Sequence, residues 1–470
     1  MGRGKIASCL LVLLFLFPSY CACEKAEAIK REAPEDTEEK TRKDEDEVKE
    51  QEQQDTETPE EEASYEWLGS WPPESIRDRV FSGKEVAKRR ALQMSKIHWT
   101  PKSGDIPSRY GVYSAGATYM GLPYSLAIKT DSHIGTQVSL YTFMTAIDNP
   151  FSVLYTEDLR KPPYSGSDCA PYYGTTCSNS VLYALGVEAP FYTYKIRSIP
   201  GMVQPRSQSP DDVEECDLLL KTGHVVMVYE VEKDTDGSLT GVKVFETTAA
   251  NQKDTWIRDF TGEEFRKYWY SNGFVRLQYS CLDNNIEYEP SMFVPMDDEF
   301  GMDDYYPLIL CTTRGDRASY RVGQDVDIAV LIDGYCWIEL YKDDEYLCRK
   351  AIDNPLVRFQ GLSYGLYKAF LLKPNGDRSN CFTSFEIIDA NAFGEKGDKI
   401  SIHFSSKNAS ARYVCICDEY HNPFNFFLLG EENRNSSSFE MDNVLGDRTT
   451  SYKVFFKGKY GVVSTEISKF

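Results

Sequence analysis

The last third of the chain carries the pattern that most restricts its fold. From Tyr305 to the C-terminus, short apolar runs alternate with Gly, Asp and Asn, and the three-to-four-residue spacing of an amphipathic helix is absent. Examples are residues 326–331, 336–341 and 367–372. Short branched and aromatic runs with this punctuation predict strands. This part of the chain is therefore expected to be all-β, in layers of packed sheets.

Two stretches of this region resemble each other. Residues 323–328 (Gly-Gln-Asp-Val-Asp-Ile) and 397–402 (Gly-Asp-Lys-Ile-Ser-Ile) open them with similar strands, and the closing strands correspond loosely. Self-similarity of this kind predicts a tandem repeat. We expect two Ig-like β-sandwiches, residues 305–392 and 393–470, although the Cys, Trp, Cys signature of a true immunoglobulin domain is not evident. They would position the rest of the protein or bind a surface ligand.

The N-terminus has the composition of an export signal. Basic residues precede an apolar run, residues 6–17, and small residues follow it, which predicts a signal peptide over residues 1–23. The run of about 12 apolar residues is shorter than the roughly 20 that span a membrane, and no later stretch approaches that length, so no transmembrane helix is expected. The protein is predicted to be secreted or on the cell surface, and a lipid anchor at Cys21 or Cys23 stays open.

Much of the formal net charge of -21 lies in one segment. Residues 24–64 contain about 18 acidic and about 7 basic side chains and almost nothing aromatic, so they cannot bury enough surface to fold. The segment is expected to be a disordered acidic spacer that holds a folded domain away from a membrane or wall, or else a solubility tail. A second acidic segment, residues 286–304, is expected to be a linker. No basic cluster is found, which argues against a nucleic-acid partner.

Residues 65–285 combine helical and strand patterns. Residues 83–97 place apolar side chains at helical spacing, and a second helical run, residues 178–185, stops at a glycine. Two later runs, residues 224–231 and 241–247, flank Asp-Thr-Asp-Gly-Ser, a turn composition, and so predict a β-hairpin. A helix followed by antiparallel strands indicates an α+β domain.

Cys177 stands at the predicted start of the second helix, after Gly-Thr-Thr. Unpaired backbone N–H groups and the positive end of the helix dipole favour a thiolate there, and the thiolate is the form that attacks carbonyl groups. The alternative is a half-cystine or a buried thiol. Cys169 is a second candidate nucleophile, but a proline follows it closely and no helical run continues from it.

The other cysteines do not define a scaffold. Ten of the thirteen cysteines follow the signal peptide, and their density over about 400 residues is too low for a disulfide-stapled fold. A metal site is weakly suggested by Cys415, Cys417 and His421. Because a Cys-x-Cys pair in an alternating strand simply places both thiols on one face, no metal is expected there.

His224 begins one strand of the hairpin, directly after the turn residues Lys-Thr-Gly. If the hairpin turn is centred near Thr235, Glu246 on the return strand comes opposite or nearly opposite His224 and on the same face. A carboxylate bonded to one imidazole nitrogen fixes the tautomer and leaves the other nitrogen to exchange a proton with a thiol. The alternative is a structural histidine and a glutamate that faces water.

At these residues the sequence resembles the NlpC-type peptidoglycan peptidases of the papain-like superfamily. Gly-Leu-Pro-Tyr at 121–124 is similar to their Gly-x-Pro-Tyr segment. Residues 174–181 are similar to their Gly-x-Asp-Cys-Ser-Gly-x-Val helix start, and residues 224–229 to their His-Val-Gly-Ile-Tyr strand. Glu246 falls where their third catalytic residue follows. The order tyrosine, cysteine, histidine, polar residue is the family's, over less than half of the chain.

The resemblance implies a multidomain chain in which an α+β papain-like (NlpC-type) domain precedes the two all-β Ig-like sandwiches. It implies that Cys177 is the nucleophile, His224 the base and Glu246 the third member of the site, with the Tyr124 hydroxyl near the thiol. The expected reaction is hydrolysis of amide bonds, with peptides of the bacterial wall polymer as substrate and without a cofactor. A transpeptidase or acyltransferase would use the same site.

The sequence also departs from the family. Thr176 replaces the usual aspartate, Asn179 the glycine after the serine, and Glu246 the more common histidine. The insertion before the nucleophile is longer than usual, and its aromatic residues, among them Phe143 and Tyr155, would form a lid over the cleft or pack in the core. These departures leave the substrate open. They also fit an alternative, a surface adhesion protein whose papain-like domain is inactive.

Overall fold

The computed structural model describes most of the chain from residue 81 onward. The described residues are 81–108, 111–124, 139–157, 174–187, 193–248, 255–283, 285–286, 309–397, 399–417, 423–429, 438–442 and 451–467. They belong to one compact unit of the chain, Ala63–Phe470. The predicted signal peptide and acidic spacer, nearly all of the predicted linker, and Cys169 and His421 lie outside the described residues.

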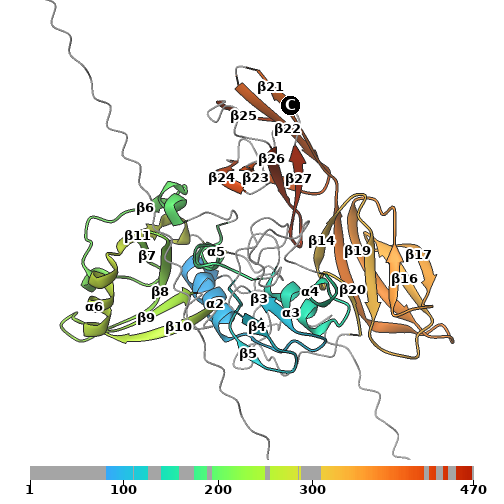
Figure 1. Cartoon of the computed structure of the whole chain (residues 1–470), viewed down its shortest axis with the longest axis horizontal. Helices are drawn as coiled ribbons and strands as arrows, with labels where there is room; N and C mark the ends of the chain where they lie inside the picture. Colours follow the sequence, from blue (N-terminus) through green and yellow to red (C-terminus); the bar gives the residue numbers. More distant parts are fainter. Residues whose placement is uncertain are drawn as a thin grey trace, which may run out of the picture. The chain divides into compact units, whose positions relative to one another are not determined.

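The α+β part is built on a six-stranded sheet with the strand order β10-β9-β8-β7-β11-β6 (Figure 1). Its strands are β6 (Met202–Val203), β7 (Leu218–Lys221), β8 (His224–Lys233), β9 (Leu239–Thr247), β10 (Thr255–Thr261) and β11 (Val275–Tyr279). The helices around it are α2 (Gly83–Lys96), α5 (Cys177–Ala184) and α6 (Gly262–Asn272). The predicted helices over 83–97 and 178–185 are thus confirmed.

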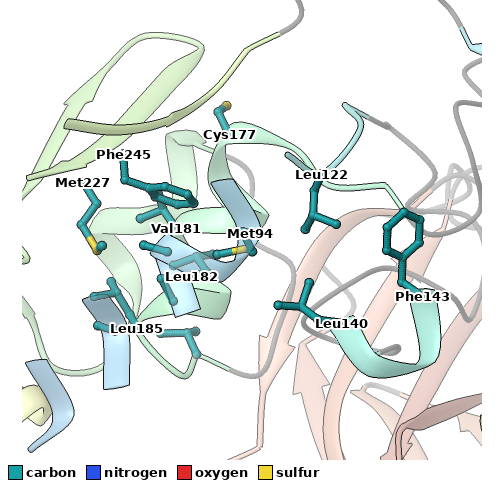
Figure 2. Packing of buried hydrophobic residues seen from close by; sticks show 14 of the residues in the cluster. Met94, Leu122, Leu140, Phe143, Cys177, Val181, Leu182, Leu185, Met227 and Phe245 are labelled. Atoms are coloured by element: carbon teal, nitrogen blue, oxygen red, sulfur yellow. The ribbon is translucent and has the colours of Figure 1, made fainter. Parts of the chain in front are cut away.

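The two faces of this sheet bury different helices because side chains alternate along each strand. Met227 and Phe245 share a buried cluster with Val181 and Leu182 of α5, and Figure 2 shows these side chains facing one another below Cys177. The intervening residues of β8 and β9 share a second cluster with Phe265 of α6 and its neighbours. A helix is therefore fixed on each side of β8 and β9.

The predicted hairpin is confirmed and is longer than expected. Strand β8 runs on to Lys233 and β9 begins at Leu239. The Asp234 N–H donates to the Ser238 carbonyl at 3.0 Å, and Gly237 has a φ of 84°, a conformation that glycine adopts without strain. The turn composition seen in the sequence therefore closes the hairpin.

Shorter elements surround this core. They are β1 (Phe81–Ser82), β2 (His98–Trp99), β3 (Ile106–Ser108), β4 (Gly111–Tyr113), β5 (Tyr119–Met120), β12 (Asn285–Ile286) and the helices α3 (Leu140–Asp148) and α4 (Val153–Thr156). The last two belong to the insertion before Cys177. Hydrogen bonds join them to the following domain: Asn149 Nδ2 donates to the Thr312 carbonyl, and the Asp316 N–H donates to Thr145 Oγ1, at 3.0 and 2.9 Å.

The C-terminal part folds into β-sandwiches, as its sequence pattern predicted. The first packs the sheet β13-β15-β18 against β14-β20-β19-β16-β17, and the second packs β21-β22-β25 against β24-β23-β26-β27. Each pair of sheets encloses its own apolar cluster. The strands of the first are β13 (Leu310–Thr312), β14 (Ala318–Arg321), β15 (Val326–Val330), β16 (Trp337–Lys342), β17 (Glu345–Ala351), β18 (Leu356–Phe359), β19 (Gly365–Leu372) and β20 (Arg378–Ile388). Those of the second are β21 (Ala390–Lys396), β22 (Lys399–Ser406), β23 (Ser410–Cys417), β24 (Pro423–Leu428), β25 (Ser438–Asp442), β26 (Ser451–Lys457) and β27 (Val462–Ile467).

The two similar sequence stretches take equivalent places in the sandwiches. Residues 323–328 lead into β15 and residues 397–402 into β22, and each is the central strand of a three-stranded sheet. Strand β21 begins at Ala390, inside the last residues of the segment expected to form the first sandwich.

One sheet of the second sandwich is buried on both faces. Val414 and Ile416 of β23 point into the sandwich. The alternate residues Tyr413, Cys415 and Cys417 belong to the apolar cluster of the α+β part. The second sandwich therefore contributes directly to the core on which α5 packs.

Candidate active site

Cys177 is the first residue of α5, and a local cap fixes this helix start. Thr176 has an extended backbone, and its Oγ1 accepts from the Asn179 N–H at 3.3 Å. Threonine and aspartate both cap helices in this way, so the departure from the family residue at 176 keeps the cap. The Cys177 side chain is 7% exposed, at the edge of the cluster in Figure 2. The thiol therefore lies among backbone N–H groups that have no acceptor within the helix.

His224 and Glu246 meet across the hairpin. Their Nε2 and Oε1 atoms are 2.8 Å apart. Met227 pairs with Phe245 in the register of β8 and β9, so the extension of that register places Glu246 beside Val226 and diagonal to His224 on the same face. The carboxylate thus reaches the imidazole from a nearly opposite position.

The imidazole also interacts with the Cys177 thiol, and this interaction raises the pKa of His224. Burial by itself lowers the pKa of His224, but hydrogen bonds and charge interactions with Cys177 and Glu246 outweigh burial and raise the pKa to about 9. His224 is therefore protonated at neutral pH. Because Glu246 occupies Nε2, Nδ1 is the nitrogen left for Cys177. Glu246 and Cys177 therefore both act on the His224 imidazole, Glu246 through a hydrogen bond of 2.8 Å.

Tyr124 lies near Cys177 through its backbone. It forms an isolated parallel bridge with Thr175, whose N–H donates to the Pro123 carbonyl at 2.9 Å. The approach depends on Gly121, which has a φ of 84° and where a Cβ atom would lie 2.2 Å from the Thr255 carbonyl oxygen. The structure thus brings the Gly-Leu-Pro-Tyr segment to the start of α5, two residues from Cys177.

Three buried hydroxyl residues near the site were not singled out from the sequence: Ser180, Thr247 and Thr255. They hydrogen-bond one another between α5, β9 and β10. Each looks like an ordinary polar residue in the sequence. The one signal that could have drawn attention to Thr247 is its place directly after Glu246, on the face of β9 that alternation turns inward.

The remaining candidates fall outside this arrangement. Phe143 is fully buried in the core and Tyr155 donates its hydroxyl to the Ile147 carbonyl at 2.7 Å, so both pack rather than form a lid. Every described cysteine is a free thiol. Within the described residues no group of three or more His, Cys, Asp or Glu side chains is placed to hold a metal ion, and no helix there is long and apolar enough to cross a membrane.

Comparisons with known proteins identify no family. No protein-family model matches the chain, and no curated protein matches it. Solved structures similar to part of it include fibronectin(III)-like modules of Clostridium thermocellum CbhA (13% identity, 34% of this chain, 91% of that chain, TM-score 0.18) and domains 3 and 4 of rat CD4 (7%, 33%, 98%, TM-score 0.20). A titin I-band fragment is similar at 13% identity over 32% of this chain and 61% of that chain, with a TM-score of 0.17. TM-scores this low do not carry an argument, so the sandwiches are described from their own sheets.

Proposed function

We propose that this chain is an exported cysteine hydrolase that cleaves amide bonds in peptides of the bacterial cell wall. The observation that carries the proposal is the hydrogen-bonded pair of His224 and Glu246, with an imidazole whose pKa is raised by Cys177, a thiol at the start of a helix. A thiol at a helix N-terminus beside a protonated imidazole is in the setting that favours the thiolate. A carboxylate on the far nitrogen holds that imidazole in place.

Acylation follows from these positions. The Cys177 thiolate attacks the amide carbonyl carbon and forms a C–S bond, while the carbonyl π electrons move to oxygen. The backbone N–H of Cys177 donates to this oxyanion, as preorganised N–H groups do in acyl-transfer enzymes. When the intermediate collapses, the C–N bond breaks and His224 transfers its proton to the leaving amine. The product is a thioester on Cys177 and a neutral imidazole.

Deacylation reverses the roles of the same groups. Neutral His224 takes a proton from water as the water oxygen attacks the thioester carbonyl. The C–S bond then breaks, which releases a carboxylic acid and restores the thiolate beside the imidazolium. Glu246 stabilises the imidazolium in both steps from its bond to Nε2. If an amine attacks in place of water, the same site catalyses transpeptidation.

The choice of wall peptides rests on the resemblance to NlpC-type peptidases. The segments that carry it, residues 121–124, 174–181 and 224–229, meet at two points: Tyr124 forms a bridge with Thr175, and His224 interacts with Cys177. Export from the cell, expected from residues 1–23, would bring the enzyme to such a substrate.

Digestion of purified wall peptides tests the proposal. The wild-type protein is expected to release new amino and carboxyl termini, detected by mass spectrometry, and Cys177→Ser to leave the peptides intact. Cys216→Ser is the matched control, because burial raises the pKa of the Cys216 thiol to about 12 and removes it from chemistry at neutral pH. Intact peptides with the wild-type protein would remove the assignment to the wall.

Labelling with a peptide electrophile distinguishes an active site from an inactive one, and the experiment does not require a known substrate. Cys281 is exposed, so the background variant is Cys281→Ser. We expect fast modification of Cys177 that His224→Ala abolishes. Slow, uniform labelling of several thiols, unaffected by His224→Ala, would favour an adhesion protein with an inactive domain.

A further inference from the structure

A chain of buried hydroxyl groups connects the elements of the candidate site. Thr247 Oγ1 donates to Ser180 Oγ at 2.7 Å, and Ser180 Oγ donates to the carbonyl of Cys177 itself at 3.2 Å. On the other side, Thr247 Oγ1 and Thr255 Oγ1 are 3.1 Å apart, and Thr255 Oγ1 donates to the Leu122 carbonyl at 3.0 Å. The chain thus runs from α5 through β9 and β10 to the Gly-Leu-Pro-Tyr segment.

Burial makes these contacts mutually dependent. Ser180 and Thr247 are 0% exposed and Thr255 is 2% exposed, so water cannot replace a missing partner from the surface. Three hydroxyl hydrogens serve four contacts, and Thr255 can direct its hydrogen to Thr247 or to the Leu122 carbonyl. Removal of Thr247 Oγ1, the middle oxygen, leaves the other two hydroxyls without their shared partner.

Thr247 connects the buried hydroxyl groups to the pair of His224 and Glu246. It follows Glu246 in β9, and alternation turns consecutive side chains to opposite faces. Glu246 is directed to His224, while Thr247 is directed to α5. The backbone of β9 is therefore fixed on one face to the helix that begins with Cys177, and it holds on the other face the carboxylate that orients the imidazole.

We propose that Thr247 is a positioning residue that sets the spacing between the Cys177 thiol and the His224–Glu246 pair, through Ser180 and Thr255. This inference rests on the proposed function. A displacement of about 1 Å of a reacting group can cost about a hundredfold in rate. Loss of the Thr247 hydroxyl is therefore expected to reduce turnover rather than substrate binding.

The matched pair Thr247→Val and Thr247→Ser tests the proposal. Valine keeps the branched shape and loses the hydroxyl, whereas serine keeps the hydroxyl. We expect Thr247→Val to lower kcat on wall peptides by about 10- to 100-fold with KM nearly unchanged, and Thr247→Ser to restore most of the rate. In the pH profile of Cys177 alkylation, the alkaline limb near pH 9 should move to lower pH in Thr247→Val only, because the imidazolium then bonds the thiolate less well.

Thr465→Val is the control for a purely structural loss. It removes one buried hydroxyl that donates to the Ala390 carbonyl at 2.8 Å, in the second sandwich. Its pH profile should match the wild type. If Thr247→Val does not fold, Ser180→Ala interrupts the same chain and should give the same shift.

Alkylation distinguishes the two levels of the proposal. One outcome overturns the positioning role and leaves the proposed function standing. In it, the rate of Cys177 alkylation in the wild-type protein depends on His224, but Thr247→Val and Ser180→Ala both keep the wild-type pH profile of alkylation and the wild-type kcat. If the rate of Cys177 alkylation in the wild-type protein does not depend on His224, both proposals are wrong.

Discussion

The six-stranded sheet holds two carboxylate–base pairs, Glu246 with His224 and Asp217 with Arg276. Both are close, at 2.8 and 2.5 Å between the nearest oxygen and nitrogen atoms. Asp217 and Arg276 are 2% and 4% exposed, and Asp217 also accepts from the Glu214 N–H at 2.7 Å. A guanidinium keeps its proton throughout the range in which proteins are folded, whereas an imidazole does not. In the proposed mechanism, similar geometry therefore serves stability in one pair and proton transfer in the other.

The largest effect is expected from His224→Ala. Without the imidazole the leaving amine loses its proposed proton donor, so the rate on wall peptides should fall by about a thousandfold. Product analysis by mass spectrometry measures the loss. His403→Ala is the control, because His403 stacks on Phe393 in the second sandwich and should leave the rate unchanged. A His224→Ala enzyme with near wild-type activity would contradict the assignment of the base.

Arg276→Met tests the other pair. It leaves the Asp217 carboxylate buried without its partner, so the free energy of unfolding should fall by about 3–5 kcal/mol. Urea unfolding, followed by hydrogen exchange of the β7 and β11 amides, measures the change. The pH dependence of Cys177 alkylation should stay as in the wild type. A shift in that pH profile would contradict the separation of the Asp217–Arg276 pair from the proposed chemistry of Cys177.

A smaller effect is expected in the pH dependence of stability. The folded-state pKa of His224 is raised to about 9, above the unfolded value near 6.5. Its contribution, up to about 3 kcal/mol, is therefore fully present below pH 6.5 and is lost as the pH rises through 9. The stability difference between wild type and His224→Ala should shrink from pH 6 to pH 10. A constant difference would contradict the raised pKa.

The smallest effect is expected from Glu246→Gln. The neutral amide keeps the shape but removes a charge that favours the imidazolium, which should lower the pKa of His224 by roughly one unit. The rate should fall by about tenfold and the alkaline limb of the pH profile should move down. Glu230→Gln, which removes a half-buried partner of Lys243 on the same hairpin, is the control and should change neither the pKa nor the rate.

Local signals explain why part of the site could be predicted from the sequence. The apolar run and its glycine stop indicate the helix that begins at Cys177, and the turn composition fixes which residues of β8 and β9 share a face. His224 and Glu246 could therefore be paired before any coordinates. The tandem sandwiches could be predicted for the same reason, because alternating apolar runs and turn residues are local sequence signals.

Contacts between distant segments could not be predicted in this way. Asp217 and Arg276 are 59 residues apart, and Thr247 and Ser180 are 67 residues apart. Polar residues of these types are usually exposed, and only contacts between segments far apart in the chain make them interior. The bonds from Thr145 and Asn149 at the end of α3 to Asp316 and Thr312 likewise depend on how two domains meet, which periodicity does not encode.

The double burial of the sheet that contains β23 has a consequence for how this protein can evolve. Tandem sandwiches are commonly treated as interchangeable cassettes, added or lost without harm to their neighbours. Here Tyr413 and Cys415 belong to the same interior as the helix that begins with the candidate nucleophile. Deletion or exchange of the terminal repeat would uncover that interior, so we expect the α+β part and its C-terminal repeat to be inherited together.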